Sequence, residues 1–149
     1  MPTTKRPKRN SVEVQYAVPR SGIPRAAALR AWAKGASNVT LRIVGAREGR
    51  RLNLYFRKID KATNVLSFPY GKGSGDVILC HPVIAREARA QGKSIAAHYA
   101  HLVVHGILHL RGYDHEKKRD AERMERREIR ILQRLGFADP YTVKSAPSP

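Results

Sequence analysis

The stretch from Ser94 to Leu110 constrains the fold most, because it is a strong helix former that also carries four histidines. Ser94 is a good N-cap, and Gly112 marks where the helix is expected to stop. At about 100° per residue, the four histidines fall within a stripe roughly 80° wide on one face of this helix. They are His98, His101, His105 and His109.

Three histidines have the spacing of a metal site. His105 and His109 are four residues apart, so their rings project from adjacent helical turns and can reach one metal ion. Gly112 tolerates the positive φ of a chain that turns back, and His115 follows three residues later. The pattern His105-x-x-x-His109-x-x-Gly112-x-x-His115 is the ligand frame of the metzincin zinc motif. Three imidazoles leave a fourth tetrahedral position open for water, which is typical of catalytic zinc.

The residue after the first of these histidines separates reaction classes. Proteases of the H-E-x-x-H type have a glutamate there as general base, whereas this chain has Gly106. Glycine cannot accept a proton, so peptide hydrolysis by that mechanism is disfavoured. Three histidines can still lower the pKa of a zinc-bound water toward ~7. The pattern therefore predicts a hydrolytic zinc site that lacks the protease base.

Length and charge narrow the class of protein. The 149 residues predict one domain. A net charge of +17, spread along the chain, favours contact with nucleic acid over a mere solubility feature. No apolar run approaches the ~20 residues of a membrane span, and the single Cys80 excludes an internal disulfide. The basic N-terminus is followed by no apolar signal region, so we expect a soluble, cytoplasmic protein without a membrane partner.

Hydrophobic patterning predicts an α+β fold. Alternation favours strands over 12–16, 39–44, 65–69 and 76–80, and Pro69 argues that the third strand lies at a sheet edge. Helices are expected over 25–33, with Pro24 as first helical residue, over a short segment ending near Arg57, and over 82–91, 94–110 and 116–135. Gly71, Gly73 and Gly75 predict a turn, and the dense charge of 116–135 predicts a solvated face.

The two ends of the chain differ from the part between them. Residues 1–10 are interpreted as a basic flexible tail, 11–141 as one domain and 142–149 as a disordered C-terminal tail. The N-terminal tail carries four candidate RNA-binding residues, which are Lys5, Arg6, Lys8 and Arg9.

Three blocks of sequence resemble the YbeY family of bacterial rRNA maturation factors. Residues 105–115, HGILHLRGYDH, match the family signature H-G-x-L-H-L-x-G-Y-D-H. Residues 56–69, FRKIDKATNVLSFP, resemble Y-R-x-x-D-x-P-T-x-V-L-S-F-P, and residues 75–80, GDVILC, resemble the strand G-D-I-x-I. Phe56 and Ala62 stand where the family has tyrosine and proline. The resemblance extends over about residues 52–141.

The resemblance implies a small, mixed, mostly four-stranded sheet packed with about five helices and a metzincin-like three-histidine zinc site. One Zn²⁺ per chain would be held by His105, His109 and His115. The implied activity is a single-strand-specific endoribonuclease in 16S rRNA 3′-end maturation, ribosome biogenesis and late ribosome quality control. The implied partners are single-stranded rRNA and the pre-ribosomal small subunit, with ribosomal proteins and the GTPase Era as further candidates and no DNA.

By match of position, the resemblance assigns catalytic roles to Arg57 and His105. An arginine can clamp a phosphate that gains negative charge, although a charge exposed at a helix end is the plainer interpretation of Arg57. Asp114 either orients an imidazole or occupies the N′ position of the next helix. The adjoining loop is expected to be held by Asn53, Asp60 and Thr63. A structural role, or a position near the groove, is expected for His98 and His101.

Two other functions remain open from the sequence. A noncatalytic, zinc-stabilised, RNA-binding ribosome assembly factor is favoured by the lack of an obvious general base. A metalloprotease is the weaker alternative, because Gly106 replaces the glutamate that it needs.

Overall fold

The computed structural model describes residues 11–114 and 116–142 of the chain. Within these residues four strands and five helices form the predicted small α+β fold. They are, in chain order, β1 (Val12–Tyr16), α1 (Ala26–Trp32), β2 (Val39–Val44), α2 (Ala46–Arg57), β3 (Val65–Gly71), β4 (Ser74–Cys80), α3 (His81–Gln91), α4 (Ile95–Leu110) and α5 (Lys118–Arg134).

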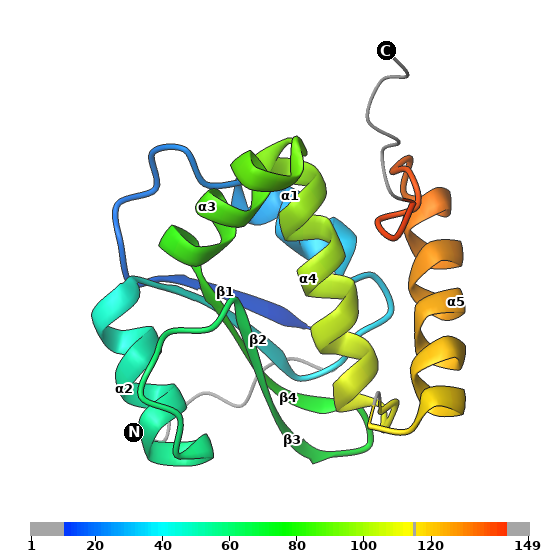
Figure 1. Ribbon diagram of the computed structural model, residues 1–149, viewed down its shortest axis with the longest axis horizontal. Coiled ribbons are helices and arrows are strands. Elements are labelled where there is room, and N and C mark those ends of the chain that lie inside the picture. The colour runs from blue at the N-terminus through cyan, green and yellow to red at the C-terminus, as the bar shows by residue number, and fades with distance from the viewer. Residues whose placement is uncertain (1–10, 115, 143–149) are drawn as a thin grey trace.

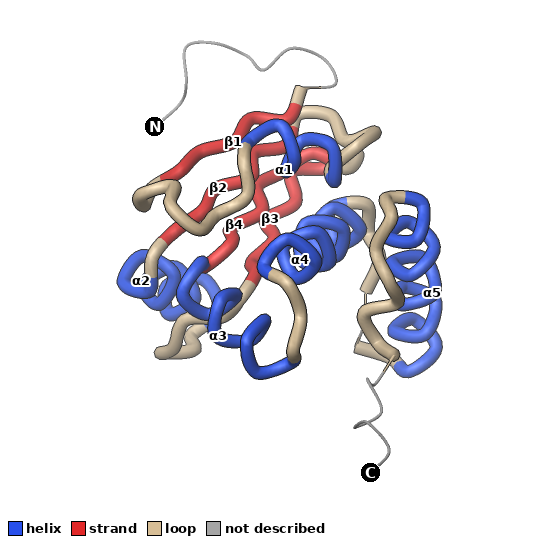
Figure 2. Tube along the Cα trace, turned by 90° about the horizontal axis from the view of Figure 1, so that it is seen from above, coloured by secondary structure: helices blue, strands red, loops and turns tan. Residues whose placement is uncertain are grey.

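The four strands form one mixed sheet with the order β1-β2-β4-β3 (Figure 2). β2 is parallel to both β1 and β4, with Leu41 opposite Val77 in the register of β2 and β4. β3 pairs antiparallel with β4 and lies at the sheet edge, which confirms the position predicted from Pro69. Proline has no N–H to donate to a second neighbour, so an edge strand accommodates it. One long side of β3 is therefore open.

Side chains alternate between the two faces of the sheet. Leu41 and Val77 point toward the larger core, which α1, α3 and α4 complete. Val44 and Ile78 point toward the smaller core on the opposite face, where Leu52 of α2 packs. The two faces thus place α2 and α4 on opposite sides of the sheet, with β3 between them (Figure 1).

Helix α4 is apolar on two sides. Val103 and Ile107 pack toward the sheet, whereas Val104 and Leu108 pack toward α5. Helix α5 therefore lies on the outer side of α4, away from the strands (Figures 1 and 2). Burying a side chain of this size stabilises the fold by about 1.5–3 kcal/mol. The histidine stripe of α4 lies between these two apolar sides.

Several predicted boundaries were wrong by a few residues. β3 and β4 continue to a tight turn at Lys72–Gly73, so Gly75 lies inside β4 and not in the turn. The strand needs glycine at this position because a Cβ would be 2.3 Å from the Phe68 carbonyl oxygen. Pro24 is not the first helical residue: Arg25, with an extended backbone, is the N-cap of α1, and the Pro24 carbonyl accepts a hydrogen bond from the Tyr16 hydroxyl.

The other helix ends agree more closely with the predictions. α2 ends at Arg57, as expected. Ser94 caps α4 by accepting a hydrogen bond from the Ala97 amide at 3.0 Å, and Gly92 ends α3 with a φ of +65°. α3 begins at His81, one residue earlier than predicted, and α5 begins at Lys118 rather than at residue 116.

Three predictions concern residues outside the described part of the chain. These are the N-terminal tail with its four basic residues, the C-terminal tail beyond Thr142, and the ligand His115. Among the described residues, no helix is both long and apolar enough to cross a membrane.

Candidate functional site

A groove of about 580 Å³ runs along the open side of β3, between the end of α2 and the histidine-bearing side of α4. We call it the β3 groove. It is lined by residues 63–69 together with Phe56, Arg57, His105, His109, Asp114 and Glu116. The groove brings together two blocks of sequence that are about 50 residues apart, and both predicted catalytic residues line it.

His105 and His109 converge in this groove. Their Nε2 atoms are 3.1 Å apart, and their ring centroids are separated by 4.6 Å. Two nitrogens that each bind a tetrahedral zinc ion at 2.0–2.1 Å lie about 3.3 Å from one another. The observed separation therefore fits two ligands of one zinc ion. His115, the third residue of the predicted set, lies outside the described residues.

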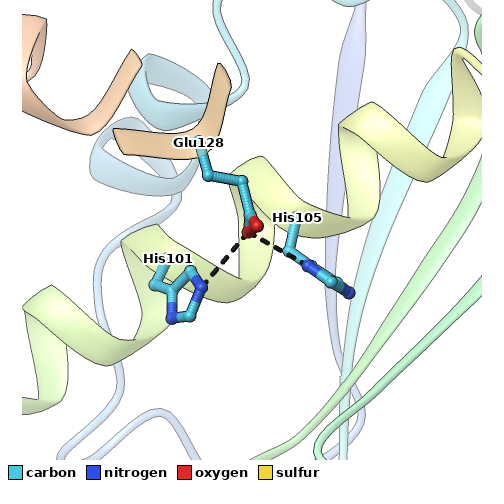
Figure 3. Close-up of side chains that lie close together, drawn as sticks. All are labelled: His101, His105 and Glu128. Atoms are coloured by element: carbon cyan, nitrogen blue, oxygen red, sulfur yellow. Dashed lines mark hydrogen bonds and ion pairs between the residues drawn. The ribbon is translucent and has the colours of Figure 1, made fainter. Parts of the chain in front are cut away.

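Glu128 of α5 orients the first of these histidines (Figure 3). Its Oε2 atom lies 3.0 Å from His105 Nδ1, and the side chain is only 1% exposed. Because a carboxylate only accepts hydrogen bonds, Nδ1 is the donor and Nε2 carries the lone pair toward the groove. Metal-binding histidines are commonly held by a carboxylate in this way.

Two further donors complete the surroundings of Glu128. The Tyr141 hydroxyl donates to Oε1 at 2.6 Å, and His101 Nε2 lies 3.2 Å from Oε2. Burial raises the pKa of the Glu128 carboxyl, but the hydrogen bonds from the two histidines and Tyr141 outweigh burial and lower the pKa to about 2. Burial and the Glu128 carboxylate both raise the pKa of Tyr141, so its hydroxyl remains protonated.

A second set of donors could also hold a metal. His101, His105 and Glu128 each offer one atom within 4.8 Å of the others. In that arrangement His105 would use Nδ1, the atom that already donates to Glu128. The Glu128 side chain is almost fully buried, whereas His105 and His109 line the open groove. A metal that must meet a substrate is therefore better placed at the groove pair.

Arg57 is the last residue of α2 and is exposed at the rim of the β3 groove. Two of the three residues expected to hold the loop that follows make contacts that hold it, and Thr63 lines the groove. Asn53 is 2% exposed and donates from Nδ2 to the Lys61 carbonyl at 2.7 Å, and Asp60 forms an ion pair with Arg50 at 2.6 Å. Arg57 thus extends from a helix end whose following loop is tied back to α2 at residues 60 and 61.

Gly106 faces the sheet and not the groove. A Cβ at this position would lie 2.7 Å from Val77 Cγ1 of β4, closer than real Cβ atoms approach. α4 can therefore approach the sheet only because residue 106 has no side chain. A glutamate in the protease position would be directed into the core, so the structure adds a steric reason to the chemical one against that mechanism.

Asp114 does not occupy the predicted N′ position. The N-cap of α5 is Lys117, so Asp114 lies three residues before it, and its Oδ1 accepts a hydrogen bond from the Glu116 amide at 3.2 Å. The helix begins at Lys118, two residues later than predicted. Asp114 lines the β3 groove, and its role as partner of an imidazole remains a prediction.

The remaining histidines of α4 lie beside a different cavity. His98 is 3% exposed and contacts Glu87 at 2.9 Å through Nε2, while His101 contacts Tyr141 and Glu128. Both line a cavity of about 780 Å³ that is also lined by residues 137–142, and neither lines the β3 groove.

Glu128 is the site residue that the sequence analysis missed. Its signal was present in the spacing, because it lies four residues from both Met124 and Leu132, which are buried. The surrounding charge of α5 obscured this apolar stripe.

The chain is similar to known proteins over most of its length. The family model described as "Endoribonuclease YbeY" matches residues 10–136. Proteins named endoribonuclease YbeY are 47% identical in Stenotrophomonas maltophilia (strain R551-3) and 49% identical in Xanthomonas axonopodis pv. citri, each covering 93% of this chain and 97% of the relative. The solution structure of TM1509 from Thermotoga maritima has a TM-score of 0.54 at 25% identity and covers 88% of this chain and 99% of that one.

Proposed function

Because the chain belongs to the endoribonuclease YbeY family, we propose that it is a zinc-dependent endoribonuclease that cuts single-stranded rRNA. The observation that carries the proposal is the meeting of Arg57 with the His105–His109 pair in one groove. Positive charge and paired imidazoles at one place suit a phosphodiester better than a peptide bond.

The proposed metal ligands are His105, His109 and His115, with one zinc ion per chain in a metzincin-like frame. When bound, zinc supplies a Lewis acid and activates water for hydrolysis. The protein's own residues would do the rest. Glu128 holds the His105 ring through Nδ1, which keeps Nε2 directed into the groove.

Arg57 is proposed to bind the scissile phosphate. Its guanidinium can form two parallel hydrogen bonds to phosphate oxygens, and these strengthen as the phosphorus centre gains negative charge. Since Arg57 is the terminal residue of α2, the side chain can reach into the groove while the helix stays anchored on the sheet.

The setting of the reaction is proposed from the family. We infer a cytoplasmic role in 16S rRNA 3′-end maturation, ribosome biogenesis and late ribosome quality control. The pre-ribosomal small subunit would present the RNA, with ribosomal proteins and the GTPase Era as candidate partners. We further propose that residues 11–141 act as one catalytic domain.

The deciding experiment compares zinc-loaded and chelator-treated protein on single-stranded rRNA fragments, on the same fragments annealed into duplexes, and on an unstructured protein. Cleavage of the single strand alone, lost with chelation and in His109→Ala, is the expected result. Elemental analysis should show about one zinc per chain in the wild type and much less in the variant. Full zinc content in His109→Ala would contradict the ligand assignment.

The same experiment tests the noncatalytic alternative. The only carboxylates among the described residues that line the β3 groove are Asp114 and Glu116, and both are exposed in the turn after α4. Neither lies on a helix or a strand, so the described residues offer no obvious general base, which favours an RNA-binding assembly factor if no cleavage occurs. Tight, zinc-dependent binding of RNA without any cut would establish that function instead.

A further inference from the structure

Exposed apolar side chains are concentrated in the block of sequence that contributes Phe56, Arg57 and residues 63–69 to the β3 groove. Among the described residues, six large hydrophobic side chains are exposed, and five of them lie between positions 54 and 70: Leu54, Tyr55, Phe56, Ile59 and Tyr70. Tyr55 and Tyr70 are each 70% exposed and Phe56 is 55% exposed. Apolar surface gathered in one place in this way usually marks an interaction site.

Two aromatic members of this group, Tyr55 and Phe56, form a row of ring contacts with the half-buried Phe68. The Tyr55 and Phe56 ring centroids are 4.8 Å apart, and the Phe56 and Phe68 centroids are 4.9 Å apart. The pairing of β3 is irregular between Pro69 and Gly71, so alternation alone does not place Tyr70. Its hydroxyl donates to Asp76, the residue that pairs with Phe68, so both rings lie on the same face of the sheet. We call these four residues the aromatic strip. Phe56 and Phe68 also line the β3 groove, so the strip is continuous with the histidine site.

Charge around the strip is mainly positive. Arg57 and Lys58 follow Phe56 directly, and the Lys58 ammonium lies 5.9 Å from the centre of the Tyr55 ring. The nearby carboxylates are largely engaged: Asp60 pairs with Arg50, and Asp76 accepts a hydrogen bond from the Tyr70 hydroxyl. Cations next to exposed rings suit a polyanion whose monomers carry flat apolar faces.

We propose that the aromatic strip stacks unpaired RNA bases next to the phosphate held in the β3 groove. This inference rests on the proposed function and adds a reason for its single-strand preference. Unpaired bases present both π-faces to a protein, whereas the bases of a duplex are already stacked on one another. The backbone would follow Arg57 and Lys58, and the bases would lie on Phe56 and Tyr55.

The test measures binding under chelation, so that no cleavage is required. Single-stranded oligonucleotides containing 2-aminopurine are titrated with the full chain, and both affinity and fluorescence quenching are recorded. Stacking quenches 2-aminopurine, so the wild type should quench on binding. Tyr55→Ala combined with Phe56→Ala should weaken binding about tenfold and remove most of the quenching. The single variant Phe56→Tyr keeps an aromatic ring, so its affinity and its fluorescence quenching should match those of the wild type.

Leu54→Ala is the matched control, because Leu54 is apolar, 45% exposed and in the same helix but not aromatic. It should change affinity less than twofold. An equal loss in the control, unchanged affinity in the aromatic variant, or binding of wild type without quenching would overturn the inference. In those cases the exposed surface would serve a protein partner. Absence of cleavage with zinc would overturn the proposed function while leaving the stacking result standing.

Discussion

Arg57 and Glu128 lie on different helices, and we assign them different roles at the site that contains His105. Arg57 is exposed at the groove, where a substrate can reach it, whereas Glu128 is buried behind the His105 ring. The first is therefore a candidate for contact with RNA, and the second is a positioning residue. Substituting each one separates chemistry from metal binding.

We expect Arg57→Ala to reduce RNA cleavage more than tenfold, which is about 1.4 kcal/mol of transition-state stabilisation. Zinc content and thermal stability should change little, because the side chain is exposed. Arg51→Ala, an exposed arginine earlier in α2, is the control for general loss of positive charge. Wild-type cleavage rates in Arg57→Ala would show that this residue is only a surface charge.

Glu128→Gln should weaken zinc binding by about 10- to 100-fold in competition with a chelator. Glutamine keeps the shape but offers one accepting oxygen where the carboxylate now serves three donors, so the hold on His105 is lost. Glu122→Gln, at an exposed position on α5, should bind zinc like the wild type. Equal zinc affinity in both variants would mean that Glu128 only packs.

At the scale of elements, the distance between α4 and the sheet determines where the histidine stripe lies. That distance depends on Gly106, whose missing side chain lets the helix rest on Val77. Ser67 of β3 also donates to the Gly106 carbonyl at 3.4 Å. The strand that borders the groove and the helix that carries His105 and His109 are thus joined at one residue.

Gly106→Ala should lower stability even though alanine favours helices by about 1 kcal/mol over glycine. The added methyl group meets a branched side chain in a strand interior, and such overpacking costs about 1–3 kcal/mol. The two effects oppose each other, and since the 2.7 Å approach forces a shift of helix or strand, we expect the melting temperature to fall by a few degrees. An increase would show that α4 moves away without cost.

The contact between α3 and α4 should make stability depend on pH. Burial lowers the pKa of His81 and of His98, so the unfolded chain binds protons more readily than the folded one. The contribution of these two histidines to the free energy of unfolding should therefore be fully present above about pH 6.5, and it should decrease as the pH falls below that value. Melting curves of chelated protein between pH 5 and 7.5 test this. His81→Gln should flatten the dependence, and an unchanged curve would assign it to other groups.

For the molecule as a whole, the charge of +17 governs encounter with RNA more than it governs the fold. Deleting residues 2–10 removes Lys5, Arg6, Lys8 and Arg9 and leaves β1 intact, because β1 begins at Val12. If the four charges contact phosphates, the slope of log K against log[salt] should fall by up to about 2.8 for single strands. Cleavage at saturating RNA should persist. An unchanged slope would place the affinity in residues 11–149.

The sequence by itself determined the elements and half of the site. Periodicity predicted the four strands and the helices, Pro69 predicted the edge strand, and the i, i+4 spacing predicted that His105 and His109 share one face. These features depend on neighbours within a few residues, which a local pattern records. Gly106 likewise argued against the protease mechanism from the sequence alone, because it replaces the glutamate base.

Only the tertiary structure decided what surrounds those histidines. Glu128 reaches His105, and Tyr141 donates to Glu128, because α5 packs on the outer side of α4. Arg57 shares the groove of His105 because α2 and α4 cover opposite faces of the sheet beside β3. The charge pattern of α5 gave no sign that one carboxylate is buried. Such meetings depend on how apolar faces far apart in the chain pack together, and local sequence does not encode that geometry.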